Sequence, residues 1–313
     1  MRNGVSPRKG WVPPKAGLLG ENLKKTFPFE DALVRLPRNP VGTQPDTCIM
    51  KTKLTLFVTV LAAALFMGGC ASVKVTEGQL QEGLIAHYPF NGDANDVSGK
   101  KNHATAKETA LSSDRNETKD QAFQFNGASS YIEIKKTRVM SFNADDFAVA
   151  VWLKFGRQNN PRRTGIIIGD ANRIEGRHGG VAIMVLDRPK GAKTLYPNKT
   201  NKRTIMLRLT SRNNEILYLP DSPHLFDDSW RHYIFQKSGN TLSIHINGEK
   251  AASREVKLLA SHRGSKTNIF IGTNISLGGQ YYRGSMDEFR IYNRALSSAE
   301  VKALYNLEKP EVQ

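Results

Sequence analysis

The chain has 313 residues, 39% of them hydrophobic, with a formal net charge of +16 and a sequence pI near 9.8. These values are typical of a soluble globular protein of one or two domains. Only two cysteines are present, which argues against a disulfide framework.

Residues 1–49 differ in composition from the rest of the chain. They hold seven of the fourteen prolines and show no periodic apolar pattern, so we expect a disordered leader. The next segment has the features of a secretory signal, which functions at an amino terminus. The leader is therefore either untranslated sequence before a start at Met50 or a disordered extension.

Residues 50–70 have the layout of a secretory signal peptide. A short basic start at Met50–Lys53 is followed by the apolar run Leu54–Met67 and then by Gly68-Gly69-Cys70. As a helix the apolar run would span roughly 21 Å at about 1.5 Å per residue, against a hydrocarbon core of about 30 Å. A signal peptide is favoured over a transmembrane helix.

The end of this segment resembles a bacterial lipobox, with Met67 where leucine is commonest. The resemblance implies lipid attachment at Cys70, and Ala71-Ser72 after the cysteine implies the outer membrane of a Gram-negative cell. The alternative is an ordinary signal peptide cut nearby, which would leave Cys70 as a free thiol. Residues 71–81 are small and polar and are expected to form a tether.

Short alternating apolar runs separated by Gly, Asn, Asp and Pro follow the tether, as in an antiparallel sandwich. Asn247-Gly248 predicts a hairpin with a type I′ turn. The spacing of Ser297 and Glu300 predicts a capping box and a helix that buries Val301 and Leu304, with Leu307 as a further candidate. The eleven expected strands are Leu84–Phe90, Ala122–Phe125, Tyr131–Ile134, Phe147–Phe155, Gly165–Gly169, Val181–Leu186, Thr204–Leu209, Trp230–Gln236, Thr241–Ile246, Asn268–Gly272 and Arg283–Tyr292.

The segment from Tyr282 to Asn306 reads YRGSMDEFRIYNRALSSAEVKALYN. Its G-x-x-D-E-x-R-I-Y-x-R-A-L-S-x-x-E pattern resembles the C-terminal signature of laminin G-like, concanavalin A-like jelly-roll domains of bacterial surface proteins. HYPFNGDANDVSGKKNHAT, FNGASSYIEI, FAVAVWLKF and WRHYIFQKSGNTLSIHINGE match the same family in the same order. The resemblance implies an all-β, antiparallel jelly-roll sandwich over residues 82–308 with a short C-terminal helix, followed by a tail at 309–313.

The same superfold includes glucanases, whose retaining chemistry needs two carboxylates about 5 Å apart. Their Glu-x-Asp-x-x-Glu pattern is absent. Asp145-Asp146, Asp227-Asp228 and Asp287-Glu288 are adjacent pairs, whose side chains would point to opposite faces of a strand. The seven histidines show no metal-ligand spacing. We therefore expect no enzymatic activity, with a glycoside hydrolase as the less favoured alternative.

The resemblance also implies one structural Ca²⁺ between the N-terminal loop and the last strand. The matching ligands are Asp96, Asn102, a carbonyl near Gly127, and Asp287. Calcium binds six to eight oxygens, and loop oxygens of this kind suit it. The alternative is that Asn95–Gly99 forms an Asx turn and that Asp287 pairs with an arginine such as Arg290.

Basic residues are concentrated in residues 155–213, which hold 13 Lys or Arg against 3 Asp or Glu. Because loops of a sandwich gather at its ends, three basic loops could form one anion-binding surface. Its candidate residues are Arg162, Arg163, Arg177, Lys190, Lys193, Lys199, Lys202 and Arg203. The alternative is an ordinary basic surface. Tyr196 is the only large aromatic residue in these loops, which argues against nucleic acid.

Two further aromatic residues invite a sugar-stacking role. Trp152 and Trp230 each lie inside an apolar strand pattern, so core packing is the favoured role for both. We predict a cell-envelope lipoprotein that binds a glycan, such as an anionic polysaccharide, or another surface component. A structural or adhesion protein with a protein partner is the alternative.

Overall fold

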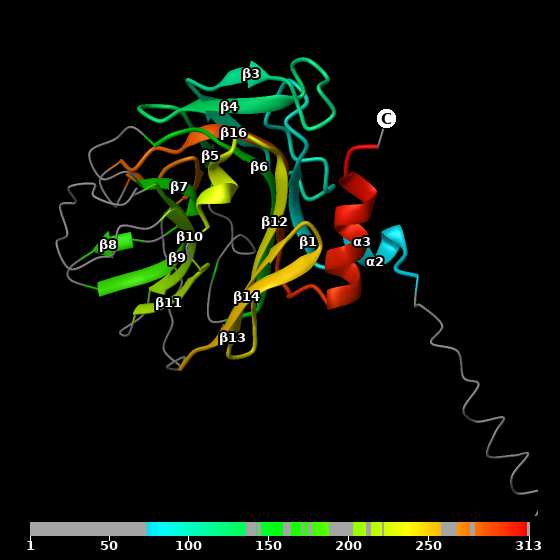
Figure 1. The fold of residues 1–313 in the computed structure, drawn as a ribbon, viewed down its shortest axis with the longest axis vertical. Helices are drawn as coiled ribbons and strands as arrows, with labels where there is room; N and C mark the ends of the chain where they lie inside the picture. The colour runs from blue at the N-terminus through cyan, green and yellow to red at the C-terminus, as the bar shows by residue number, and fades with distance from the viewer. Residues whose placement is uncertain are drawn as a thin grey trace, which may run out of the picture. The chain divides into compact units, whose positions relative to one another are not determined.

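A computed structural model describes residues 74–135, 142, 145–158, 164–170, 172–174, 177–187, 203–210, 214–220, 222–257, 268–275 and 279–311. The leader and the signal-like segment with Cys70 lie outside the described residues. Two antiparallel sheets face each other, and the helices α2 and α3 lie beside the first sheet (Figure 1). The expected all-β sandwich with a short C-terminal helix is confirmed.

The first sheet has β16 near its centre. β6 pairs along one side of β16, whereas β4 pairs with the first half of its other side and β1 with the second half. A β-bulge between Asp287 and Arg290 separates the halves, and Glu288 has a φ of 50° there. In spatial order the strands are β14 (Glu249–Glu255), β13 (Thr241–Ile246), β12 (Arg231–Ser238), β6 (Phe147–Phe155), β16 (Arg283–Tyr292), β4 (Ala122–Asn126) and β3 (Ala110–Ser112), with β1 (Leu84–Tyr88) beside β16.

The second sheet carries the long hairpin of β9 and β10. In spatial order its strands are β11 (Asn214–Tyr218), β10 (Arg203–Thr210), β9 (Arg177–Asp187), β7 (Thr164–Gly169), β15 (Ile269–Ile271), β5 (Tyr131–Ile134) and β2 (Ala104–Lys107), with β8 (Asn172–Ile174) paired to β9. The short 3-10 helix η1 (Pro223–Phe226) connects β11 to β12.

All eleven expected strands are present, and the described residues contain five more: β2, β3, β8, β11 and β14. Four of these are the end strands of the two sheets, and β8 pairs only with β9. An end strand buries little, as the mostly exposed β14 shows, so its sequence lacks the alternation that reveals a strand. The β13–β14 turn matches its prediction, with Asn247 at φ 49° and Gly248 at φ 83°.

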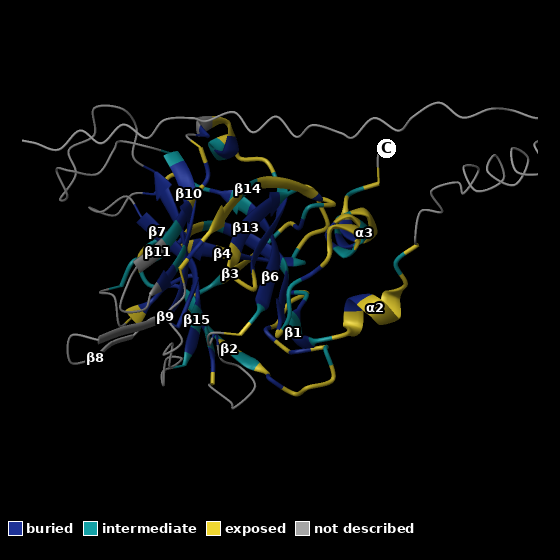
Figure 2. Cartoon of the chain, turned by 90° about the horizontal axis from the view of Figure 1, so that it is seen from below, coloured by how far each residue is buried: buried dark blue, intermediate teal, exposed yellow. Residues whose placement is uncertain are grey.

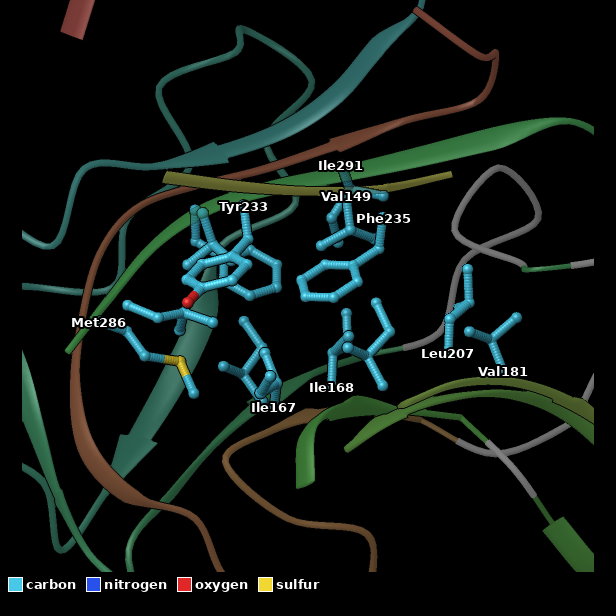
Figure 3. Packing of buried hydrophobic residues seen from close by; sticks show 14 of the residues in the cluster. Val149, Ile167, Ile168, Val181, Leu207, Tyr233, Phe235, Met286 and Ile291 are labelled. Atoms are coloured by element: carbon cyan, nitrogen blue, oxygen red, sulfur yellow. The ribbon is translucent and has the colours of Figure 1, made fainter. Parts of the chain in front are cut away.

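The core lies between the sheets, where residues of both inner faces interdigitate. Val149, Phe235 and Ile291 of the first sheet face Ile168 and Leu207 of the second (Figure 3). The outward side of β6 is also buried, because Ala148 and Ala150 pack under α3. Burial on both faces explains the nearly continuous apolar run of β6.

Helix α3 (Ser298–Glu308) closes the outward face of the first sheet. The expected capping box is present: the Glu300 N–H donates to Ser297 Oγ at 3.3 Å, and the Ser297 N–H donates to Glu300 Oε2 at 2.8 Å. Val301 and Leu304 are buried as predicted, but Leu307 is 56% exposed and Glu308 only 5%. Glu308 lies two turns after Val301 and therefore on the same helix face.

Helix α2 (Glu77–Gln81) lies in the segment expected to be a tether. Leu80 packs in one cluster with Leu84 and Tyr292, and Arg294 donates to the backbone oxygen of Gln79 at 2.8 Å. The folded domain therefore begins before residue 82. Figure 2 shows α2 beside α3, with its outer side exposed. The contact of α2 with Tyr292 and Arg294 lies at the C-terminal end of β16.

Candidate ligand-binding site

Asp187, at the end of β9, joins the ends of two basic segments. Its carboxylate accepts from the Gln158 N–H at 2.9 Å and contacts Arg203 Nε at 2.9 Å. Gln158 precedes residues 159–163, and Asp187 and Arg203 flank residues 188–202. The two segments contain seven Lys or Arg and no Asp or Glu. Their described ends are therefore held together by one buried carboxylate.

The Gln158 side chain ties this junction to the first residue of β16. Its amide nitrogen donates to the Arg283 carbonyl at 2.7 Å and to the Gly156 carbonyl at 2.8 Å, and its oxygen accepts from the Arg283 N–H at 3.0 Å. Gln158 is fully buried. Gln158 thus links the two sheets, because its backbone N–H binds Asp187 of β9 and its buried side chain binds Arg283 of β16.

Gly284 allows β16 to approach β6 closely beside this junction. Its φ is 143°, and a Cβ built on it would lie 2.3 Å from the Lys154 carbonyl oxygen and 2.9 Å from the Gly156 nitrogen. Both are backbone atoms, which cannot rotate away as a side chain can. Glycine is required here by space and by backbone conformation.

We call this part of the sandwich the basic end, defined by Lys154, Arg157, Arg203, Arg283 and the flanks of segments 159–163 and 188–202. Arg157 and Arg283 are exposed. Arg231 nearby forms a bidentate pair with Asp227, at 2.7 Å for each contact. That pairing lowers the pKa of the Asp227 carboxyl.

The basic loops are only partly brought together. Arg203 pairs with Asp187 and lies 5.8 Å from the Phe226 ring, so it supports the junction. Arg177 begins β9, ten residues before Asp187, which places it about 33 Å away at roughly 3.3 Å per residue. The expectation that all three loops share one end is therefore wrong for Arg177. The remaining candidates, Arg162, Arg163, Lys190, Lys193, Lys199 and Lys202, lie outside the described residues.

The two tryptophans have different surroundings. Trp152 is 2% exposed, and its indole N–H donates to Glu308 at 2.9 Å under α3, which fits the core role. Trp230 is only half-buried. It precedes β12 next to the Arg231–Asp227 pair, and Asp228 beside it reaches Lys154 of the basic end at 4.0 Å. Trp230 therefore lies next to the basic end.

Of the four expected calcium ligands, Asp96 and Asn102 share one loop, where the Asn102 N–H donates to Asp96, whereas Gly127 and Asp287 have different partners. Asp96 accepts from the backbone N–H groups of Ser98 and Asn102 in its own loop and of His87 in β1, and Asp287 contacts Arg115. Gly127 lies against Arg283 at the start of β16, whereas the Asp96 loop joins β1 at His87, opposite Arg290. Seven residues of β16 separate these points, about 23 Å at roughly 3.3 Å per residue. Within the described residues, no three His, Cys, Asp or Glu side chains gather to hold a metal.

A buried cluster of charged residues lies at the end of α3, on the outward face of the first sheet. Arg290 contacts Glu308 and lies 3.0 Å from Glu288, which also reaches His87 at 2.6 Å. Burial, with help from the Glu288 charge, raises the pKa of Asp287 to about 7 in spite of the Arg115 guanidinium. The cluster therefore contains a carboxyl that titrates near neutrality.

His232 lies at the aromatic side of this cluster. Its ring lies 5.4 Å from Trp152 and 6.2 Å from Tyr305 between centroids. Its Nε2 lies 3.6 Å from Glu308 Oε2, and neither ring nitrogen makes a hydrogen bond in the described part of the chain. Burial, and then the charges of Arg290 and Arg115, lower its pKa to about 3. His232 is therefore a neutral core residue.

The bulge at Glu288 changes the expected geometry of one acidic pair. Asp287 and Glu288 do not point to opposite faces: both reach the Arg115 guanidinium, Glu288 at 3.9 Å. An extra residue in one strand reverses the alternation locally. The pair lies among arginines and is mostly buried, so it resembles an internal ion network more than the acid and nucleophile of a hydrolase. Asp227-Asp228 lies in a bend after η1 and not in a strand, with Asp228 at φ 64°.

The two-sheet fold now has a counterpart among known families. The family model Laminin_G_3, described as the concanavalin A-like lectin/glucanases superfamily, matches residues 126–302. This match covers more than half of the chain, and the chain belongs to that superfamily.

Its relatives include parts of larger toxins. Paraclostridial mosquitocidal protein 1 of Paraclostridium bifermentans is 23% identical over 232 residues, which are 73% of this chain and 18% of that protein. The crystal structure of its binding domain has a TM-score of 0.55 at 19% identity, covering 73% of this chain and 53% of that one. A botulinum neurotoxin serotype D ligand binding domain in complex with N-acetylneuraminic acid has a TM-score of 0.52 at 15% identity, covering 73% and 52%. The chain thus spans about half of each binding domain.

Proposed function

We propose that this chain is a non-catalytic binding protein whose basic end takes an anionic glycan. The observation that carries the proposal is the junction at Asp187, which joins the described ends of two segments rich in Lys and Arg. Exposed Arg157 and Arg283 add to the same positive surface. Guanidinium groups bind carboxylate and sulfate oxygens through paired hydrogen bonds.

Two similar structures support a role in binding anionic glycans. The serotype D domain was crystallised with N-acetylneuraminic acid, a sugar that carries a carboxylate, and cell entry of botulinum neurotoxin type C is described as dependent on two ganglioside molecules. Because this chain spans about half of those domains, the ligand is inferred mainly from the charge at the basic end.

We expect polysialic acid to bind the chain and neutral dextran to bind much less. Affinity for polysialic acid should fall steeply between low and physiological salt, because exposed charges lose their reach as the Debye length shortens to about 8 Å. Replacing Arg162 and Arg163 by Gln should weaken binding about tenfold, equivalent to about 1.4 kcal/mol. Isothermal titration over a salt series measures both effects.

Arg177→Gln is the matched control for this experiment. It removes one positive charge from the opposite end of β9 and should leave affinity for polysialic acid nearly unchanged. Melting temperatures of all variants should stay close to that of the native chain, because exposed charges contribute about 0–1 kcal/mol to folding. Equal weakening by the Arg177 change, or binding insensitive to salt, would count against a site at the basic end.

We also propose that Cys70 carries a lipid anchor that holds the domain in the cell envelope, at the outer membrane. The motif after the apolar run supports this. As a separate finding, the described part of the chain contains no helix long and apolar enough to cross a membrane. Cys70→Ser should move the protein from the membrane fraction to the soluble fraction or leave it unprocessed, because each buried acyl CH₂ contributes about 0.8 kcal/mol. Fractionation with immunodetection tests this. Normal processing and retention of the variant would rule out an anchor at Cys70.

A further inference from the structure

The residues expected to bind calcium do not form a site for it. Calcium needs six to eight oxygens converging at about 2.3–2.6 Å. The Asp96 carboxylate is already used by the N–H groups of His87, Ser98 and Asn102 at 2.8 to 2.9 Å. The Asn102 amide donates to the Ile85 carbonyl at 2.7 Å. These groups fold the loop, and the carboxylate of Asp287 has a different cationic partner.

That partner is Arg115, which comes from the loop between β3 and β4. Asp114 shapes this loop by accepting from the N–H groups of Asn116 at 2.9 Å and Thr118 at 2.7 Å. The Arg115 side chain is only 11% exposed. A short loop organised around one carboxylate therefore presents the arginine inward.

The Arg115 guanidinium lies against four residues of three elements, β16, α3 and β6. It pairs with Asp287 of β16, lies 3.9 Å from Glu288 at the bulge, and donates from Nε to the Glu308 carbonyl of α3 at 2.5 Å. It also lies 5.5 Å from the centre of the Trp152 ring of β6. These contacts lie where β16 changes partner from β4 to β1.

We propose that Arg115 serves as the structural cation of this domain, in the place where a bound calcium ion would otherwise join the N-terminal part to the last strand. A guanidinium always carries its charge and offers five donors in a rigid plane, so it can neutralise a buried carboxylate and cap the last carbonyls of a helix together. Calcium would have to displace it from Asp287. The folded chain is therefore indifferent to calcium.

Thermal unfolding of the full chain tests this inference. The melting temperature should be the same with millimolar calcium and with EDTA, because a bound ion would stabilise the native state in proportion to RT ln(1 + [L]/Kd). Arg115→Met keeps an apolar stem beside Trp152 but leaves Asp287 buried without a cation. We expect it to lower the melting temperature by about 10 °C.

Three further variants separate pairing from packing. Adding Asp287→Asn to Arg115→Met should restore part of the lost melting temperature, since the uncompensated charge is removed. The melting temperature of Arg115→Lys should lie between those of the native chain and Arg115→Met. Arg231→Met removes an arginine from the exposed Asp227 pair and should shift the melting temperature by no more than about 2 °C. A calcium-dependent rise in the native chain, or no recovery in the double variant, would overturn the inference. If Arg115→Met does not fold, the calcium comparison and Arg115→Lys still decide it.

Discussion

Gly284→Ala is expected to destabilise the domain by about 3 kcal/mol or more. The added Cβ would lie 2.3 Å from the Lys154 carbonyl oxygen and 2.9 Å from the Gly156 nitrogen, and φ at this residue is 143°. To remove this steric clash, β16 and β6 would have to move apart, which would break the hydrogen bonds between them. Urea unfolding followed by circular dichroism measures the change.

Gly99→Ala is the matched control for that substitution. Gly99 also has a positive φ, 81°, but a Cβ there meets nothing within 4 Å. Gly99→Ala should lower the free energy of unfolding only by the cost of holding alanine at a positive φ, about 1 kcal/mol. Similar losses at the two positions would mean that the contact with β6 is not responsible. If the contact is responsible, Gly284→Ala should also weaken glycan binding at temperatures where the domain is folded, because Gly156 leads to the basic end.

Opposite effects on pH-dependent stability are expected from Asp287→Asn and His232→Phe. The pKa of Asp287 is raised from 3.8 to about 7, so the folded state binds more protons between these values. Acidification from pH 7 to pH 5 therefore stabilises the native chain through Asp287 by about 2 kcal/mol. Asp287→Asn removes this gain, and its stability should fall more steeply with acid.

The pKa of His232 is lowered from 6.5 to about 3, so the unfolded state binds the extra proton. The contribution of neutral His232 to the free energy of unfolding is fully present above pH 6.5. It is lost as pH falls toward 3, and the loss is about 2 kcal/mol at pH 5. His232→Phe keeps a ring beside Trp152 and Tyr305 and should make the stability fall less steeply with acid. Arg115, Arg290 and Glu288 act on both groups, Asp114 acts on Asp287, and Glu308 lies beside His232. All five are unchanged in both variants.

Urea unfolding of the three proteins at pH 7, 6 and 5 measures these slopes. His224→Gln, which alters an exposed imidazole of η1, controls for histidine replacement in general. Parallel profiles for Asp287→Asn and His232→Phe would contradict the assigned burial of the two groups. Expressed relative to each protein's own stability at pH 7, the three profiles should diverge below neutrality, with Asp287→Asn falling most steeply and His232→Phe least steeply.

Local signals in the sequence predicted much of the fold. The Ser297 and Glu300 spacing and the Asn247-Gly248 turn each determine the geometry of a few adjacent residues, so each could be read without tertiary context. The end strands could not, because a strand such as β14 is paired on one side and largely solvated. Their formation depends on a neighbouring strand that the local sequence does not specify.

The site was less predictable for the same reason. The concentration of basic residues was visible in the sequence, but the position of Arg177 depends on how far β9 extends past its neighbours. Arg115 and Asp287 are 172 residues apart, and no spacing rule connects them. The bulge at Glu288 is also invisible in a pattern that assumes strict alternation.

The attachment of α2 has a practical consequence for how the chain can be studied. Its contact with Arg294 and Tyr292 lies at one end of β16, whereas Arg283 and the Asp187 junction lie at the other, about 30 Å away at roughly 3.3 Å per residue. A chain immobilised through a tag before Thr76 would therefore present its basic end to the solution. A tag on the loops flanked by Asp187 and Arg203 would cover that end, so biosensor measurements on polysaccharides should use N-terminal capture.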